Sequence, residues 1–326
     1  MTTEQPAPQG TIGTTWLVGD VGATNAHFGL VAPDGAVLHS SNFACADFAE
    51  IGDALDAYLA MRGSLPMPRL GALAIAALIT GDQIRMTNHP WSFSVAALRD
   101  RLGLERLLAI NDFTAVALAL PRLGPNDRMP VGGGVPIAGR PIAVLGPGSG
   151  LGASALTPDG GRWSPLTGEG GHVTMPAVTA RENAVLDWMR RRFDHVSAER
   201  CLSGPGLVNL YNALAGIDGV PAAPYTAAQI TDTATAARDP LCREATAMFC
   251  AMLGTVAGDL ALTLGAKGGV YIAGGIVPRL GARFVESGFR ARFEAKGRLS
   301  AHLAAIPSYV VTHPLPAFLG CVAALS

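Results

Sequence analysis

The sequence predicts an α/β protein of two domains, each of which begins with two strands joined by a glycine-containing turn. The chain has 326 residues, whereas a typical domain has roughly 150. Short apolar runs typical of buried strands alternate with helical patterns along the first half. Two strand–turn–strand segments, Thr15–Val31 and Pro141–Leu156, lie about half the chain apart and indicate an internal duplication.

The first half shows the clearer alternation of strands and helices. Two β-rich runs flank the turn GDVGATN within Thr15–Val31, which predicts a hairpin. A helix is expected over Asp47–Arg62, because its apolar residues share one face and Asp47 with Glu50 forms a capping-box pattern. The other elements expected here are a strand near Ala36–His39, a strand at Leu73–Ile79, a helix at Ser94–Leu102 capped by Ser94 and closed by Gly103, a strand at Leu107–Ile110 and a helix at Phe113–Leu120.

The second half begins after residues 121–139, a segment rich in Pro and Gly that is expected to be a linker. Pro141–Leu145 and Ala153–Leu156 then flank the turn GPGSGLG and predict a second hairpin. The C-terminal third is mostly helical, and Ala245–Gly258 is predicted to be a buried helix. Near the end, Gly269–Val277 predicts a buried strand that ends in a diglycine and leads into a helix.

The composition argues against several classes of protein. With a net charge of −1 and no basic stripe, the chain is not expected to bind nucleic acid. Although 49% of the residues are hydrophobic, 40 glycines and 23 prolines interrupt the apolar runs, so no membrane span of about 20 apolar residues is expected. The five cysteines are scattered without a CxxC pair, which favours reduced thiols in the cytoplasm over disulfides or a zinc site. Residues 1–14 are polar, lack the pattern of a signal peptide and are predicted to be a disordered tail.

The two glycine turns suit a polyphosphate, because only glycine lets backbone N–H groups approach its oxygens closely. Asp20 places a carboxylate beside the first turn, where it could hold Mg²⁺ directly or through water. Either turn alone could be an ordinary hairpin turn, and it is the duplication that favours phosphate binding. There is no GxxxxGK[ST] motif, and the dinucleotide fingerprint fails at Leu151. The residues expected at the phosphates are Gly19, Gly22, Thr24 and Asn25 in the first turn and Gly148, Ser149 and Gly150 in the second.

Three acidic residues and one histidine are further candidates for chemistry. Asp112 lies where a predicted strand ends and a helix begins, the position at which sites gather in α/β folds. It could serve as a helix N-cap, or as the base that accepts the proton of a hydroxyl during phosphoryl transfer. In GEGGH, Glu169 and His172 stand on a flexible backbone poorly suited to core packing, which favours ligand binding. Glu199 by itself carries little signal and is typical of a surface helix.

Taken together, these segments closely resemble the bacterial glucokinase family. The resemblance runs in the family's order from about Thr15 to the end of the chain, leaving only the N-terminal tail outside it. The segments that carry it are GDVGATNAHFGL, ITGDQIRMTNHPWSF, INDFTAVALAL, GPGSGLG, GEGGHV, SAERCLSGPGLVNLY, VYIAGGIVPR and SGFRARFEAKGR.

The resemblance implies the actin-like (ribonuclease H-like) ATPase fold, with two α/β domains flanking a cleft. The small domain is expected over residues 15–122, completed by residues 313–326, and the large domain over residues 123–312. It also implies a cytoplasmic enzyme that phosphorylates glucose from ATP with Mg²⁺, forms a homodimer and binds neither membrane nor nucleic acid.

The resemblance further assigns roles to individual residues. The family's sugar contacts fall on Asn111, Asp112, Glu169, His172 and Glu199, with Asp112 as catalytic base, and its adenosine segment falls on Ala273–Gly275, including Gly274 and Gly275. One departure is Pro147 in the second turn, which has no N–H to donate, although Ser149 keeps a hydroxyl there.

Other functions remain open at this point. The nearest is a kinase for another hexose, such as fructose, mannose or an amino sugar. A sugar-responsive regulator on the same fold would carry an N-terminal helix-turn-helix, for which the residues before the first strand are too few. An actin-like assembly or chaperone ATPase would lack the set formed by Glu169, His172 and Glu199.

Overall fold

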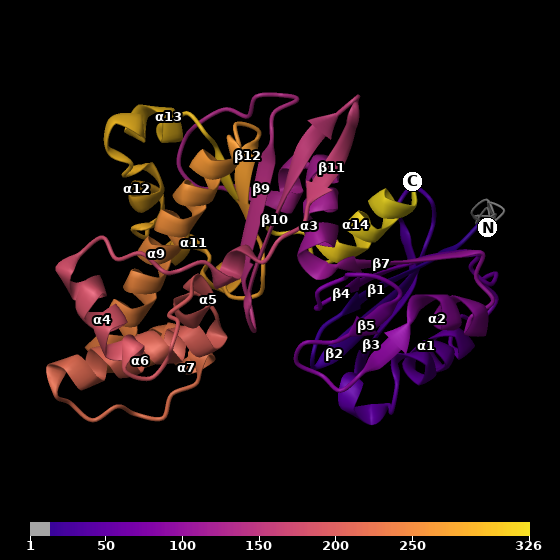
Figure 1. The fold of residues 1–326 in the computed structure, drawn as a ribbon, viewed down its shortest axis with the longest axis horizontal. Coiled ribbons are helices and arrows are strands. Elements are labelled where there is room, and N and C mark those ends of the chain that lie inside the picture. The colour runs from indigo at the N-terminus through magenta and orange to yellow at the C-terminus, as the bar shows by residue number, and fades with distance from the viewer. Residues whose placement is uncertain (1–13) are drawn as a thin grey trace, which may run out of the picture. The chain divides into compact units, whose positions relative to one another are not determined.

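The computed structural model describes residues 14–326, which form two compact units. The first unit contains the described residues up to Ala115 together with Ala317–Ser326, and the second contains Val116–Pro316 (Figure 1). The disordered tail predicted for residues 1–14 lies, apart from Thr14, outside the described residues. The boundaries expected between the small and the large domain, at residues 122 and 313, stay a prediction.

A five-stranded sheet forms the centre of the first unit. Its strands are β1 (Trp16–Val21), β2 (Asn25–Val31), β3 (Val37–Ala44), β4 (Leu70–Ile75) and β7 (Arg106–Asn111). The spatial order is β3-β2-β1-β4-β7. β1 and β2 are antiparallel around the first glycine turn, which confirms the predicted hairpin. β1, β4 and β7 are parallel, and their last residues Val21, Ile75 and Asn111 end level with one another.

Helices and a small hairpin complete this unit. They are η1 (Cys45–Asp47), α1 (Ile51–Ala60), β5 (Gln83–Arg85), β6 (Ser92–Ser94), α2 (Val95–Arg101), the start of α3 (Asp112–Ala119) and α14 (Pro316–Leu325). As predicted, Ser94 caps α2 by accepting a hydrogen bond from the Ala97 N–H at 3.0 Å, and Gly103 follows with a left-handed φ of 65°.

The capping box predicted for Asp47 and Glu50 is wrong. Asp47 belongs to the short turn η1, and α1 begins only at Ile51. Glu50 precedes the helix but makes no side-chain cap bond. Its carboxylate pairs instead with Arg101 of α2, so a tertiary ion pair has replaced the local cap.

Close packing of α14 fixes the start of α3. Gly29 in β2 leaves room for the ring of Phe318, because an added Cβ would lie 3.1 Å or less from it. Gly320 lies directly against the carbonyl oxygen of Ala115, where no side chain fits. The C-terminal helix therefore holds both the hairpin and the helix that follows β7.

The second unit repeats the sheet arrangement of the first. Its strands are β8 (Arg128–Pro130), β9 (Ile142–Pro147), β10 (Leu151–Asp159), β11 (Arg162–Leu166), β12 (Gly269–Ile272) and β13 (Ser308–Val311). The order is β11-β10-β9-β12-β13-β8. β9 and β10 are antiparallel around the second glycine turn, which confirms the second predicted hairpin. β9, β12 and β13 are parallel, like β1, β4 and β7.

The segment expected to be a linker is instead part of this unit, so that prediction is wrong. Residues 121–139 contain the short helix η3 (Pro125–Asp127) and β8, which pairs with β13. β8 is an edge strand, and at an edge the missing N–H of Pro130 costs no ladder hydrogen bond. A composition rich in Pro and Gly therefore did not prevent a short strand from forming.

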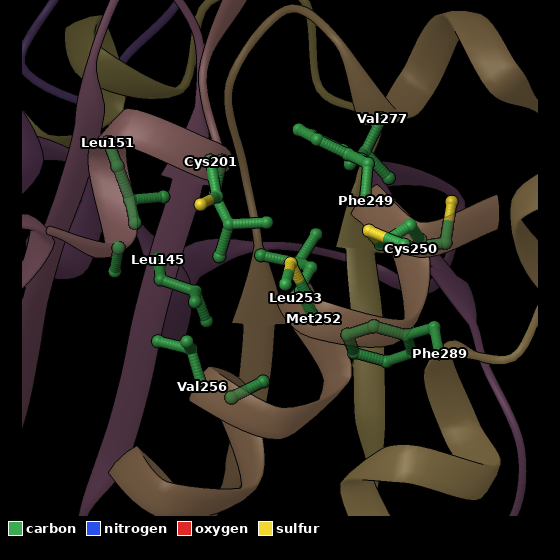
Figure 2. Packing of buried hydrophobic residues seen from close by; sticks show 14 of the residues in the cluster. Leu145, Leu151, Cys201, Phe249, Cys250, Met252, Leu253, Val256, Val277 and Phe289 are labelled. Carbon is green, nitrogen blue, oxygen red and sulfur yellow. The ribbon is translucent and has the colours of Figure 1, made fainter. Parts of the chain in front are cut away.

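Helix α9 (Pro240–Leu264) is the central helix of the second unit. Figure 2 shows its residues Phe249, Met252, Leu253 and Val256 among buried side chains from other elements. It is long and apolar enough to cross a membrane, but 61% of its most apolar window is buried inside the molecule, which confirms the predicted buried helix. The other helices are η2 (Leu120–Arg122), η4 (Gly170–His172), α4 (Ala180–Arg190), α5 (Ala198–Cys201), α6 (Gly204–Asp218), α7 (Ala227–Thr231), α8 (Thr233–Arg238), α10 (Val277–Leu280), α11 (Ala282–Val285), α12 (Phe289–Glu294), η5 (Gly297–Leu299) and α13 (Ser300–Ala304).

Candidate active site

The first glycine turn is closed by its own backbone and braced from β3. The Gly22 N–H donates to the Asn25 carbonyl at 2.9 Å, while Thr24 and Asn25 are exposed. Cys45, which directly follows β3, donates its backbone N–H to the Thr24 carbonyl at 2.9 Å and its thiol to the Gly22 carbonyl at 3.4 Å. Cys45 is thus a bracing residue that the sequence did not indicate.

Gly19 is closely packed inside the first sheet, and its expected phosphate contact stays a prediction. It lies inside β1 and is buried, and an added Cβ would come within 2.7 Å of the Leu73 side chain. Packing between β1 and β4 therefore accounts for this glycine without any phosphate contact.

Asp20 is the last residue but one of β1 and lies beside the first turn. Burial raises the pKa of its carboxyl to about 6. Among residues 14–326, no hydrogen bond or ion pair to this carboxyl is found. A desolvated carboxylate without a protein partner, next to a glycine turn, suits the oxygen-seeking Mg²⁺ ion.

Asn111 and Asp112 stand at the junction of β7 and α3. The Asn111 side-chain oxygen accepts hydrogen bonds from the N–H groups of Phe113 at 3.0 Å and Thr114 at 3.1 Å, which makes Asn111 the helix N-cap. The Asn111 amide donates to an Asp112 carboxylate oxygen at 2.9 Å. The Asp112 carboxylate also accepts the Phe113 N–H at 2.9 Å. Asn111 and Asp112 therefore share the cap of α3, and Asn111 orients the neighbouring carboxylate.

The first unit gathers its candidate residues at one sheet edge. Val21, Ile75 and Asn111 are level in the parallel register, and adjacent strands are about 4.8 Å apart. The first turn and the Asn111–Asp112 pair therefore share the carboxyl edge, with one strand between them.

The second glycine turn is held by neighbouring elements. The Gly148 N–H donates to the Gly150 carbonyl at 2.8 Å, and Gly204, at the start of α6, donates its N–H to the Gly148 carbonyl at 2.8 Å. Ser149 is exposed at the tip of the turn. The sequence reasoning missed Gly204, for which the glycine-rich text SGPG was an available signal.

The diglycine after β12 lies against the second turn. Gly274 has a left-handed φ of 81°, and a Cβ there would overlap the Pro147 carbonyl. The neighbouring Ala273 N–H donates to the Leu145 carbonyl at 2.9 Å. Gly275 has open space around its Cα, since an added Cβ would meet no atom within 4 Å. The segment assigned to adenosine and the second turn are thus adjacent.

Glu199 is bonded to the second turn rather than exposed on a surface helix. Its side-chain oxygen accepts the Leu151 N–H at 2.8 Å, and an added Cβ at Gly150 would overlap that carboxylate. Leu151 is also contacted by the turn η4, because Gly171 of η4 lies directly against the Leu151 carbonyl. Leu151 therefore connects the second turn to the GEGGH segment and to Glu199.

The remaining candidates of the second unit are on η4. The side chains of Glu169 and His172 are both exposed, and the His172 N–H donates to the Glu169 carbonyl at 3.0 Å. Glu169, His172 and Glu199 thus belong to the second unit, whereas Asn111 and Asp112 belong to the first.

Comparison with known proteins identifies the family. The family model for glucokinase matches residues 17–326. A glucokinase from Paramagnetospirillum magneticum is 54% identical over 305 residues, which cover 93% of this chain and 95% of that protein. A crystal structure of glucokinase from an Antarctic psychrotroph is 36% identical with a TM-score of 0.86, covering 95% of this chain and 98% of that one.

A more distant structure agrees in fold. Glucokinase from Balamuthia mandrillaris, solved in complex with glucose, is 21% identical with a TM-score of 0.82, over 96% of this chain and 94% of that chain. The two duplicated sheets and these matches confirm the predicted actin-like ATPase fold. The chain belongs to the glucokinase family.

Proposed function

We propose that Asp112 is the general base with which this member of the glucokinase family phosphorylates glucose from ATP. The observation that carries the proposal is the shared edge of the first sheet, where Asn111 orients Asp112 level with the end of β1 and its glycine turn. A base is effective only if it is held within hydrogen-bond reach of the hydroxyl that it deprotonates. Asp112 would accept the proton of the 6-hydroxyl as this oxygen attacks the γ-phosphorus.

The phosphate groups would be bound by backbone N–H groups and hydroxyls of the two turns. Gly22 and Gly148, whose N–H groups close their own turns, would let the phosphates approach the backbone closely. The donors would be Thr24 and Asn25 of the first turn and Ser149 and Gly150 of the second, with Gly274 and Gly275 beside the adenosine. Pro147 has no N–H, so the turn's donors must come from the residues after it. Asp20 would hold Mg²⁺, directly or through water, and the bound ion would neutralise charge on the phosphate oxygens.

The sugar would be held by carboxylate, amide and imidazole groups. Glu169, His172 and Glu199 would bind hydroxyls of glucose, together with Asn111 and Asp112. Because Glu199 also accepts the Leu151 N–H, the sugar set and the second phosphate turn would act as one group. We further propose that the enzyme is cytoplasmic, in keeping with its five buried, unbridged cysteines. The homodimer is proposed from the family resemblance alone.

Replacement of Asp112 by Ala tests the base. We expect kcat to fall by about 10²–10⁴-fold. The melting temperature should fall by only a few degrees, because Asn111 still accepts the Phe113 and Thr114 N–H groups when the Asp112 bond to Phe113 is lost. Asp100→Ala is the matched control, since Asp100 is exposed and pairs only with its neighbour Arg99. Near-normal turnover in Asp112→Ala would refute the assignment.

A panel of sugars tests the substrate. Glucose should give the highest kcat/KM, and fructose, mannose or glucosamine much lower values. Without sugar, ATP hydrolysis should be slow, whereas hydrolysis at the same rate without glucose would indicate an ATPase rather than a sugar kinase.

A further inference from the structure

We infer that a cavity in the second unit, remote from the second glycine turn, binds a small organic anion that carries a ring. The cavity has a volume of about 200 Å³ and is lined by Ile142, the first residue of β9, and by Gly268, which precedes β12. The second glycine turn follows Pro147, the last residue of β9. At roughly 3.3 Å per residue, the length of β9 separates the two places by about 17 Å.

Two arginines give this cavity an uncompensated positive charge. Arg128 and Arg140 both line it, and no Asp or Glu does. Within residues 14–326, neither arginine forms an ion pair. A cation of this kind is stabilised by a carboxylate or phosphate, which matches the fork of N–H donors on a guanidinium.

Aromatic side chains hold Arg128 in place without neutralising it. Its Nη1 donates to the Tyr271 hydroxyl at 2.6 Å, and its guanidinium carbon lies 4.7 Å from the ring centre of Tyr309. A guanidinium fixed by rings is pre-ordered for a ligand, because little side-chain freedom remains to be lost on binding. The N–H groups that Tyr271 does not use have no other protein acceptor in the described part of the chain.

The apolar residues of the lining would contact the uncharged ring of the ligand. Trp163, Leu120 and Pro121 present aromatic and aliphatic surface to the cavity. A cavity of about 150 Å³ holds benzene, so the volume here accommodates one ring and an anionic group. The chemistry therefore points to a ring-bearing phosphate monoester or carboxylate.

The position of the cavity suggests an effect on turnover. Leu120, Pro121 and Leu123 follow directly on α3, the helix whose first residue is Asp112. A ligand that contacts this segment should alter the rate of sugar phosphorylation. This effect rests on the proposed role of Asp112, whereas binding of the anion does not.

Calorimetry with phenyl phosphate tests the site. The full chain is first saturated with glucose, Mg²⁺ and AMPPNP, so that the glycine turns are occupied. Phenyl phosphate should then bind at least tenfold more tightly than inorganic phosphate, because only the ester fills the apolar part. Benzoate is titrated in parallel, and whichever of the two ring compounds binds more tightly identifies the anionic group as phosphate or carboxylate.

Arginine variants locate the binding. Arg128→Gln and Arg140→Gln should each weaken binding by about tenfold, in line with the loss of a hydrogen bond to a charged group. Arg140 is exposed, so its replacement should leave the fold intact even if Arg128→Gln does not. Arg162→Gln is the matched control, since Arg162 precedes Trp163 but does not line the cavity.

Two results would overturn the inference. Absence of saturable binding of either ring compound to the saturated enzyme would exclude the site, as would equal binding by the wild type and both arginine variants. If the ring compound binds here but leaves kcat and both KM values unchanged, the effect on turnover is refuted although the site stands.

Discussion

The two glycine-turn hairpins occupy the same place in their sheets but are held in different ways. Each first strand, β1 or β9, lies between its hairpin partner and a parallel strand. The turn after β1 is braced through Cys45, which directly follows β3, the strand that pairs with β2. The turn after β9 is bonded to Glu199 of α5 and Gly204 of α6, elements far along the chain.

The charge beside the two turns also differs. The last residue but one is Asp20 in β1 and Gly146 in β9. The first turn therefore has a carboxylate suited to a cation, whereas the second has none in its strand and contacts the carboxylate of Glu199 instead. The two turns thus have similar backbones, and in the proposed function the side chains beside them would serve the metal at the first turn and the sugar at the second.

Among changes at the two turns, the largest effect should come from breaking the support of the second turn. In Gly171→Ala the new methyl group would overlap the Leu151 carbonyl, and the backbone must shift. Since a displacement of about 1 Å can cost about 10²-fold in rate, we expect kcat/KM for glucose to fall by about that factor. Gly168→Ala, in the same segment, is the control, because an added Cβ there meets nothing within 4 Å. Equal activities of the two variants would show that this contact is not needed.

A smaller effect should distinguish how the two turns are braced. Glu199→Ala removes the acceptor of the Leu151 N–H, so we expect KM for ATP to rise about tenfold along with KM for glucose. Cys45→Ala removes only a weak thiol bond at the first turn and should raise KM for ATP less than threefold, by roughly 0.5 kcal/mol, without changing KM for glucose. An unchanged KM for ATP in Glu199→Ala would separate the sugar residue from the phosphate turn.

The smallest effect concerns stability and pH at the first turn. The folded pKa of Asp20, about 6, lies above its ordinary value of 3.8, so the folded state holds this proton more tightly than the unfolded state. The stabilisation from this group is complete below pH 3.8 and is lost as the pH rises through 6. In the nucleotide-free protein, Asp20→Asn should therefore melt a few degrees above the wild type at pH 7.5 and close to it at pH 4.

The same variant tests the metal. Mg²⁺ with AMPPNP should raise the melting temperature of the wild type more at pH 7.5 than at pH 5, where Asp20 is mostly protonated. Asp20→Asn should show less of this pH dependence, because only the titration of the nucleotide phosphate remains. A pH dependence as large as that of the wild type would show that the ion is bound by other groups.

The sequence alone predicted much of the fold because its signals are local. Both hairpins, the Ser94 cap of α2 and the buried helix α9 follow from alternation, turn residues and apolar content within short windows. The prediction failed where a distant partner intervened. Glu50 pairs with Arg101 instead of capping α1, and Pro130 sits in an edge strand paired with β13.

The candidate site shows the same limit. The resemblance to the glucokinase family indicated which residues would form the site. The sequence itself predicted that a helix begins near Asp112. The packing of Gly19 against Leu73 and the bond from Leu151 to Glu199 depend on contacts between distant segments. The Asn111 cap is local, but its bonds became visible only in the structure.

The sequence by itself determined the family, the paired glycine turns and the order of strands and helices, since these depend on residue type and spacing along the chain. The tertiary structure decided which side chains hold each turn and which arginines are left without a counter-charge. Hydrogen bonds and charges act through space, and residues as far apart in sequence as Leu151 and Glu199 become neighbours only when the chain has folded.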